Sequence, residues 1–325
     1  MIRPALSVLS PGGPGARLSI LIFHRVLPEP DALFPGEVHA AQFDRQLGWL
    51  RQWFQVLPLS EAVQRLGAGT LPARAAAITF DDGYADNATE ATPLLQKHGL
   101  SATFFVSAGF LDGSCMWNDG VIEVLRATRR EQINPAEIDP AMTAQTLPLQ
   151  TPNQRRAAIE VFLGHIKYLH PAERLDRVSW LSAACGVELP RGLMMTPDQV
   201  RGMQRGGMTI GAHTMTHPIL AKLDDASARH EIQESKRVLE DVTGGRIGLF
   251  AYPNGKPAQD YSLRSVELVR EAGFDAAVAT AWGTADAGTD RFQLPRFTPW
   301  DPQRLRFAAR MAQNLMRRET LPALL

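Results

Sequence analysis

Two pairs of polar residues lie at sequence spacings that are typical of metal-binding or catalytic sites. Asp81 and Asp82 are adjacent carboxylates, and His213 and His217 are four positions apart. An i, i+4 spacing puts two imidazoles on one face of a helical turn, as in many zinc sites. One carboxylate with two histidines leaves coordination positions open for water and substrate. The pattern therefore indicates a metal site with a second carboxylate beside it.

Each pair also has a plain structural interpretation. Asp81-Asp82-Gly83 is good turn chemistry, and solvated histidine pairs at this spacing are common. However, adjacent carboxylates at the end of a buried strand are hard to explain structurally. Neighbours in a strand point to opposite faces, so one carboxylate would enter apolar packing. The two pairs together favour the metal site over the turn.

Short apolar runs between the polar motifs predict the strands that must position them. Each run has the length of a strand, and helical patterns separate most of them, which is typical of a mainly parallel sheet. The predicted strands are 18–23, 75–80, 102–106, 208–212, 247–251 and 274–279, with 292–297 as a weaker seventh. The predicted helices that bear on the site are 227–242 and 262–272, with a covering helix at 304–318.

The candidate chemical residues follow directly after these strands. Asp81 follows the strand at 75–80, His213 follows 208–212 and His24 follows 18–23. Tyr252 and Asn254 come after the strand at 247–251. Polar residues at the carboxyl ends of parallel strands share one face, where the active sites of α/β barrels assemble. We therefore expect these side chains to meet.

The stretch at about 112–192 departs from the strand–helix pattern. Four prolines punctuate its first half, and helical segments are predicted at 155–169 and 171–185. We interpret the stretch as a helical insertion between two barrel strands. Residues 1–325 are then a single catalytic domain that carries this insertion.

Three motifs in order resemble those of the polysaccharide deacetylase family, carbohydrate esterase family 4, which has the NodB homology domain. The first two are highly specific together, and the third is weaker. The resemblance covers about 18–110 and 193–297. The motifs are Thr79-Phe80-Asp81-Asp82-Gly83-Tyr84, His213-Thr214-Met215-Thr216-His217-Pro218 and Phe250-Ala251-Tyr252-Pro253-Asn254-Gly255.

The resemblance implies a fold and a metal-dependent reaction. The fold is α/β, a distorted (β/α) barrel of about seven strands. The metal is a divalent ion, zinc first, with cobalt, manganese or iron as alternatives. The metal would polarise the carbonyl group of a substrate amide and the water molecule that the metal binds. The implied metal ligands are Asp82, His213 and His217, with Asp81 as the general base.

The third motif departs from the family pattern. Many members carry an arginine and a tyrosine where Ala251 and Asn254 stand. The arginine normally orients the base, and Arg296 is the candidate to do so from another strand. A backbone N–H near Asn254 would still hold the oxyanion, because it needs no side chain. Tyr252 and Asn254 are therefore the predicted oxyanion and substrate residues.

The family's late Leu-x-His motif, which supplies the acid, is absent near the C-terminus. Phe23-His24-Arg25 resembles the permuted arrangement of a subgroup that deacetylates biofilm polysaccharides. His24 follows a predicted strand, and histidine side chains titrate near neutral pH, which suits a general acid. Two alternatives remain for His24: a passive, hydrogen-bonded histidine and an additional metal ligand.

The resulting functional prediction is metal-dependent hydrolysis of the N-acetyl group of an N-acetylated sugar or polysaccharide. An alternative enzyme would keep the metal but cleave a non-sugar amide, such as a cyclic ureide or a formamide. Another alternative is a non-catalytic carbohydrate-binding relative. Asp81 speaks against this last possibility, because a pure binder has little use for a base beside a metal.

The amino-acid composition narrows the range of possible binding partners. The 34 basic and 34 acidic residues balance, and no basic run indicates nucleic acid. The two cysteines, Cys115 and Cys185, exclude a disulfide framework and a thiolate metal site. There is no apolar run of signal-peptide length near the start and none long enough to cross a membrane. We therefore expect a cytoplasmic protein whose partner is an N-acetylated carbohydrate.

Overall fold

The computed structural model describes residues 2–317, so the ends of the predicted 1–325 domain lie outside it. The chain divides into two compact units. The first unit comprises residues 1–29, 38–112 and 195–325, and the second comprises 30–37 and 113–194. Among the described residues, no helix is long and apolar enough to cross a membrane. The interpretation of the whole chain as one domain remains a prediction.

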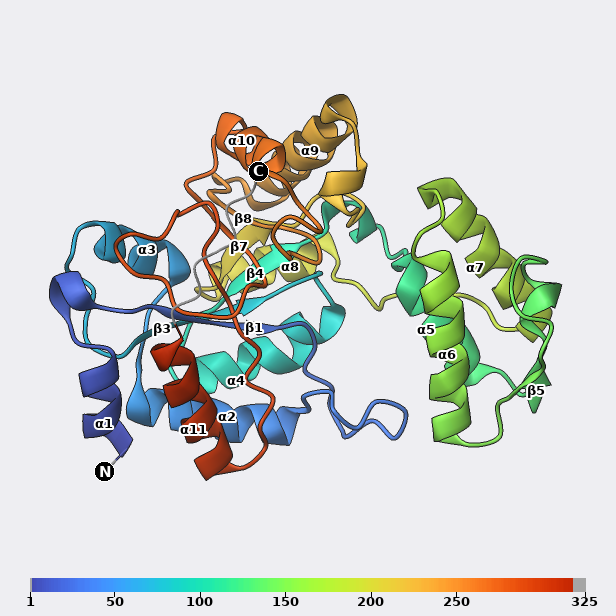
Figure 1. The fold of residues 1–325 in the computed structure, drawn as a ribbon, viewed down its shortest axis with the longest axis horizontal. Coiled ribbons are helices and arrows are strands. Elements are labelled where there is room, and N and C mark those ends of the chain that lie inside the picture. Colours follow the sequence, from blue (N-terminus) through green and yellow to red (C-terminus); the bar gives the residue numbers. More distant parts are fainter. Residues whose placement is uncertain (1, 318–325) are drawn as a thin grey trace. The chain divides into compact units, whose positions relative to one another are not determined.

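A parallel sheet, curled into a half-barrel, forms the centre of the first unit (Figure 1). The neighbouring strands pair in parallel in the order β1-β3-β4-β7-β8-β9. All six coincide with predicted strands and confirm the α/β barrel class. Their bounds are β1 Ser19–Phe23, β3 Ala75–Phe80, β4 Thr103–Val106, β7 Thr209–Ala212, β8 Leu249–Ala251 and β9 Ala276–Val278.

The seventh strand is not the predicted one. It is β2, Gln55–Val56, which pairs with the beginning of β3. Residues 292–297 instead form isolated bridges, from Leu294 to β9 and from Phe297 to β1. Pro295 lacks an N–H group and therefore interrupts a continuous ladder. The segment still connects the two ends of the sheet, because it hydrogen-bonds to both strands.

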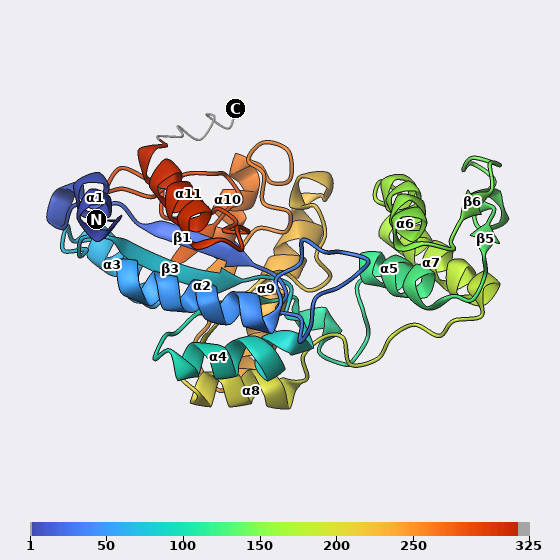
Figure 2. The same ribbon diagram turned by 90° about the horizontal axis from the view of Figure 1, so that it is seen from below.

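Helices cover the half-barrel, and their ends follow from the sequence. Helices α2, α4 and α8 lie on one side of the sheet in Figure 2. The predicted helix at 227–242 is α9, which ends before Gly244 in the left-handed conformation. The helix predicted at 304–318 ends two residues earlier, at Met316, and Arg318 lies outside the described residues. The helices are α1 Ile2–Leu9, α2 Ala40–Trp53, α3 Leu59–Gly67, α4 Thr92–Lys97, α8 Pro197–Arg205, α9 Asp225–Thr243, α10 Leu263–Glu271 and α11 Arg304–Met316.

The second unit is a small helical body with its own apolar core. Its helices are α5 Trp117–Ala127, α6 Pro152–Ile166 and α7 Pro171–Cys185, and β5 Gln132–Ile133 pairs with β6 Leu147–Pro148. The predicted insertion at 112–192 matches most of it. Residues 30–37 also belong to it, which the sequence pattern did not reveal. Asp31 in this segment accepts two hydrogen bonds from Arg126 in α5.

Candidate active site

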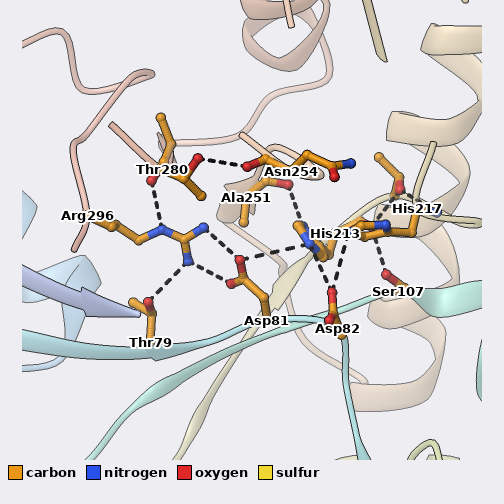
Figure 3. Close-up of polar contacts among 12 residues, drawn as sticks. Thr79, Asp81, Asp82, Ser107, His213, His217, Ala251, Asn254, Thr280 and Arg296 are labelled. Carbon is orange, nitrogen blue, oxygen red and sulfur yellow. Dashed lines mark hydrogen bonds and ion pairs between the residues drawn. The ribbon is translucent and has the colours of Figure 1, made fainter. Parts of the chain in front are cut away.

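The candidate residues lie where parallel strands end. His24 follows β1, Asp81 and Asp82 follow β3, and His213 follows β7. Asn254 lies three residues beyond the end of β8. Because these strands are parallel, their carboxyl ends share one edge of the half-barrel. The close-up in Figure 3 shows Asp81, Asp82 and the two histidines of the 213–217 motif gathered at this edge.

Asp82, His213 and His217 form a group that fits a metal ion. One donor atom from each lies within 4.8 Å of the others. The Asp82 Oδ1 atom is 3.5 Å from His213 Nε2 and 3.4 Å from His217 Nε2. One carboxylate and two imidazoles are a donor set that divalent ions such as zinc accept. Within residues 2–317, this is the one such group of three donors.

Backbone contacts orient the His213 imidazole toward Asp82. The Nδ1 atom donates to the Ala251 carbonyl oxygen at 2.8 Å. Because a carbonyl oxygen only accepts, Nδ1 carries the hydrogen and Nε2 keeps its lone pair for a ligand bond. The His213 carbonyl oxygen also accepts from the Ser107 hydroxyl at 3.1 Å. The ring is therefore held in the tautomer that suits coordination.

The neighbouring carboxylate, Asp81, has a different partner. Its two oxygens accept hydrogen bonds from Arg296 at 2.7 Å each. Arg296 is fully buried and also donates to the Ala279 carbonyl oxygen at 3.0 Å and to the Thr79 hydroxyl at 3.2 Å. The structure thus brings Arg296 to Asp81, as the sequence analysis expected. Asp81 Oδ2 also lies 3.9 Å from His213 Nε2.

Both carboxylates remain ionised because of their surroundings. Burial raises the pKa of Asp81, but Arg296 outweighs burial and holds that pKa below its ordinary value. Burial likewise raises the pKa of Asp82, but the interactions with His213 and His217 outweigh burial and hold that pKa below its ordinary value. A positive charge on His24 also lowers the pKa of both carboxyls. His24 therefore lies within electrostatic reach of the site.

The pKa values of the two imidazoles shift in opposite directions. Burial lowers the pKa of His217 to about 4, so this ring is neutral near pH 7 and offers a lone pair. Burial also opposes the charged form of His213, but the adjacent Asp81 and Asp82 outweigh it and raise the pKa of His213. The carboxylates therefore outweigh burial at His213 but not at His217.

The backbone at the site is strained. Six non-glycine residues within 2–317 have a positive φ, and four of them are at the site. Such conformations cost energy, and they cluster at functional sites. Their φ angles are 75° at Asp82, 63° at Thr214, 56° at His217 and 58° at Asn254.

Tyr252 is buried, whereas Asn254 is exposed. The Tyr252 hydroxyl donates to the Phe292 carbonyl oxygen at 3.0 Å, and its ring stacks on Tyr261. Its N–H donates to the Val278 carbonyl oxygen. Both polar hydrogens of Tyr252 are therefore already bound to backbone carbonyl groups and are not available to an oxyanion. Tyr252 is therefore a core residue, which corrects its assignment as an oxyanion or substrate residue. Asn254 is exposed near the two histidines in Figure 3, and no hydrogen bond within residues 2–317 uses its N–H.

Sequence reasoning missed several residues that hold the site together. Asn87 donates to the His24 carbonyl oxygen at 2.8 Å and fixes the turn after β1. Glu231, in α9, accepts hydrogen bonds from the segment between the two histidines. Thr79 bridges Arg296 and the Leu21 carbonyl oxygen. Of these, only Thr79 stood within a recognised motif.

Comparison with known proteins gives a family for this chain. Residues 68–277, about two thirds of the chain, match the family model described as polysaccharide deacetylase. The matched range contains both aspartates, both motif histidines and Asn254, while His24 and Arg296 lie outside it.

Individual relatives agree with this match. YxkH of Bacillus subtilis (strain 168), whose name assigns it provisionally to the polysaccharide deacetylases, is 21% identical over 283 residues, covering 86% of this chain and 71% of YxkH. The fold is similar to the Streptococcus pyogenes deacetylase PplD in complex with acetate, with a TM-score of 0.59, 18% identity and 93% and 99% of the two chains covered. It is equally similar to IcaB from Ammonifex degensii, with a TM-score of 0.59, 19% identity and 94% and 98% covered. At these identities the structures show the fold, and the family model, together with the fold, shows that this chain belongs to the polysaccharide deacetylase family.

Proposed function

We propose that this protein hydrolyses the N-acetyl group of an N-acetylated sugar or polysaccharide and depends on a divalent metal ion, with zinc as the preferred ion. The carrying observation is the adjacency of two differently held carboxylates. Asp82 faces two imidazoles at 3.4–3.5 Å, and Asp81 is held by Arg296. A donor set beside an ionised base suits hydrolysis of an unactivated amide.

Asp82, His213 and His217 would hold the ion. When bound, it would supply Lewis acidity to the amide carbonyl and to water. The orientation of His213 by the Ala251 carbonyl oxygen and the neutral form of His217 support this assignment. The order of preference among metals rests on the donor set, which also suits cobalt, manganese and iron.

Asp81 would take the proton of the attacking water. Arg296 uses one lone pair on each Asp81 oxygen, so each oxygen can accept one more hydrogen bond. The water oxygen bonds to the acetyl carbon as its proton passes to Asp81. Arg296 keeps Asp81 ionised and fixes the plane of its carboxylate, because its own side chain is anchored to the Ala279 carbonyl oxygen.

His24 would protonate the leaving nitrogen. The C–N bond then breaks to release a neutral amine and acetic acid. Acetic acid returns a proton to His24 and becomes acetate, and Asp81 releases its proton to solvent. His24 is exposed at the end of β1 and influences the pKa of both carboxyls, which supports a place beside the reacting amide. Asn87 holds its backbone carbonyl. The Asn254 N–H is the candidate donor to the oxyanion.

The relatives support an acetyl substrate. PplD is a deacetylase whose solved structure holds acetate, the product that this reaction would release. The carbohydrate part of the proposal comes from the family to which the chain belongs.

The direct test is acetate release from N-acetylglucosamine oligomers. The chelated protein should be inactive and should regain activity with Zn²⁺, Co²⁺, Mn²⁺ or Fe²⁺. A cyclic ureide and a formamide are included to test the non-sugar alternative. Hydrolysis of these compounds but not of the sugar oligomers would contradict the proposal. Oligomer binding without acetate release under any of the four metals would favour a carbohydrate-binding protein instead.

A further inference from the structure

The short segment between the two motif histidines is held from both sides. Thr214 and His217 at its ends have left-handed backbone conformations, so the segment would relax if it were free. On one side its carbonyl groups accept hydrogen bonds: Thr214 from the Ala108 N–H at 3.0 Å and Met215 from the Gly109 N–H at 2.9 Å.

A single carboxylate holds the other side. Glu231 Oε2 accepts hydrogen bonds from the N–H groups of Met215 at 2.8 Å and Thr216 at 2.9 Å. Glu231 Oε1 accepts from the Thr216 hydroxyl at 2.7 Å. Glu231 lies in α9, fourteen residues beyond His217 in the sequence, and its hydrogen bonds go to Met215 and Thr216 rather than to either imidazole. Successive N–H groups of this kind form a concave site for an anion, which Glu231 fills from within the chain.

We propose that Glu231 is a positioning residue that sets the metal affinity of the site by holding His213 and His217 at the spacing that an ion requires. This inference rests on the proposed function. The His217 N–H donates to the Thr214 hydroxyl at 3.1 Å, so displacement of the segment passes directly to His217. Residues that orient metal ligands in this way typically change metal affinity by about 10–100-fold.

A second glutamate of α9 provides a matched control. Glu240 Oε1 accepts a hydrogen bond from the Ile247 N–H at 3.0 Å, in the segment that leads to β8. Glu231→Ala and Glu240→Ala therefore each remove a carboxylate of the same helix that holds a backbone N–H. Only Glu231 holds the segment between the histidines.

The test measures the dissociation constant for Zn²⁺ by competition with a chromophoric chelator, together with the unfolding midpoint of each metal-free variant. Glu231→Ala should weaken Zn²⁺ binding by about 10–100-fold, whereas Glu240→Ala should bind Zn²⁺ like the wild type. Both variants should be modestly less stable without metal. Equal Zn²⁺ affinity in Glu231→Ala and wild type, or an equal loss in Glu240→Ala, would overturn the inference.

Two milder variants cover the case in which Glu231→Ala does not fold. In Glu231→Gln the amide oxygen can still accept both N–H groups, so affinity should recover most of the way to wild type. Thr216→Val removes one of the three hydrogen bonds and should weaken Zn²⁺ binding less than Glu231→Ala. If Glu231→Ala does not fold, wild-type Zn²⁺ affinity in Thr216→Val would overturn the role of Glu231. A wild-type protein that binds none of Zn²⁺, Co²⁺, Mn²⁺ and Fe²⁺ would instead contradict the metal site itself, and with it the proposed function.

Discussion

The first unit and the second unit each contain a buried aspartate that is held by an arginine and approached by a histidine. In the first unit, both oxygens of the aspartate accept from the arginine at 2.7 Å. In the second unit, one oxygen accepts from the arginine at 2.8 Å and from the histidine at 2.9 Å. The two clusters are Asp81, Arg296 and His213 in the first unit and Asp139, Arg177 and His165 in the second.

The two clusters differ in what surrounds them. Asp139 follows a short helical turn, and its other oxygen accepts from the Ala141 N–H at 2.9 Å. It thereby joins α6 and α7 to that turn, which is a structural task. Asp81 instead adjoins a second carboxylate with a positive φ, at the edge where parallel strands end. A buried Asp–Arg pair is thus not by itself a sign of catalysis, whereas its position and its neighbours are.

The largest expected effect comes from removing a proposed metal ligand. His213→Ala should lose most bound metal and nearly all acetate release, because two donors cannot replace three. His165→Ala, the matched histidine of the other cluster, should keep both. Elemental analysis and the acetate assay measure the two outcomes. Full metal occupancy in His213→Ala would contradict the ligand assignment.

The next effect separates the two aspartates. Asp81→Asn should keep its metal but lower kcat by roughly 10²–10⁴-fold, because the isosteric amide cannot accept the proton. Asp139→Asn should leave kcat per folded molecule unchanged. The measurement is steady-state acetate release by metal-loaded protein. A near-wild-type rate for Asp81→Asn would rule out Asp81 as the base and make the clusters equivalent.

A substrate comparison sharpens the role of His24. His24→Ala should slow hydrolysis of the N-acetyl sugar by about 10²-fold and leave metal content unchanged. An activated acetate ester should suffer much less, because its leaving group needs little protonation. Equal losses on both substrates would count against the acid role and favour a passive histidine. Loss of metal would instead make His24 a ligand.

The smallest effect is on the stability of the second unit. Arg177, the Ala141 N–H and His165 hold the pKa of Asp139 below its ordinary value of 3.8. A depressed pKa stabilises the folded state above the ordinary value and loses that contribution as pH falls through the folded pKa. Asp139→Asn should therefore cost about 2 kcal/mol at pH 6. The difference from wild type should shrink below about pH 4 in denaturant titrations; a constant difference down to pH 2 would contradict this account.

Six of the seven strands of the main sheet were predictable because their apolar runs are short and continuous. Parallel pairing then placed Asp81, Asp82 and His213 together without further information. The approach of Arg296 was expected from the family pattern, since the usual arginine position is Ala251. Its two hydrogen bonds to Asp81 appear only in the structure.

Other features depend on contacts that no local pattern encodes. Glu231 resembles any other acidic residue of an amphipathic helix until its hydrogen bonds to Met215 and Thr216 are seen. Tyr252 stands in a motif, but packing against Tyr261 directs its ring into the core. Residues 30–37 join the second unit through Arg126, a pairing 95 positions apart in the sequence.

The left-handed backbone at Asp82 and His217 has a consequence for directed evolution. Glycine adopts this conformation without the penalty of about 1–2 kcal/mol that a residue with a Cβ pays. A library selected for heat resistance alone would therefore be drawn toward glycine at position 217, where the gain in stability costs a proposed ligand. Screening for thermostability in this protein needs a simultaneous screen for acetate release, because the two properties oppose each other at the same residue.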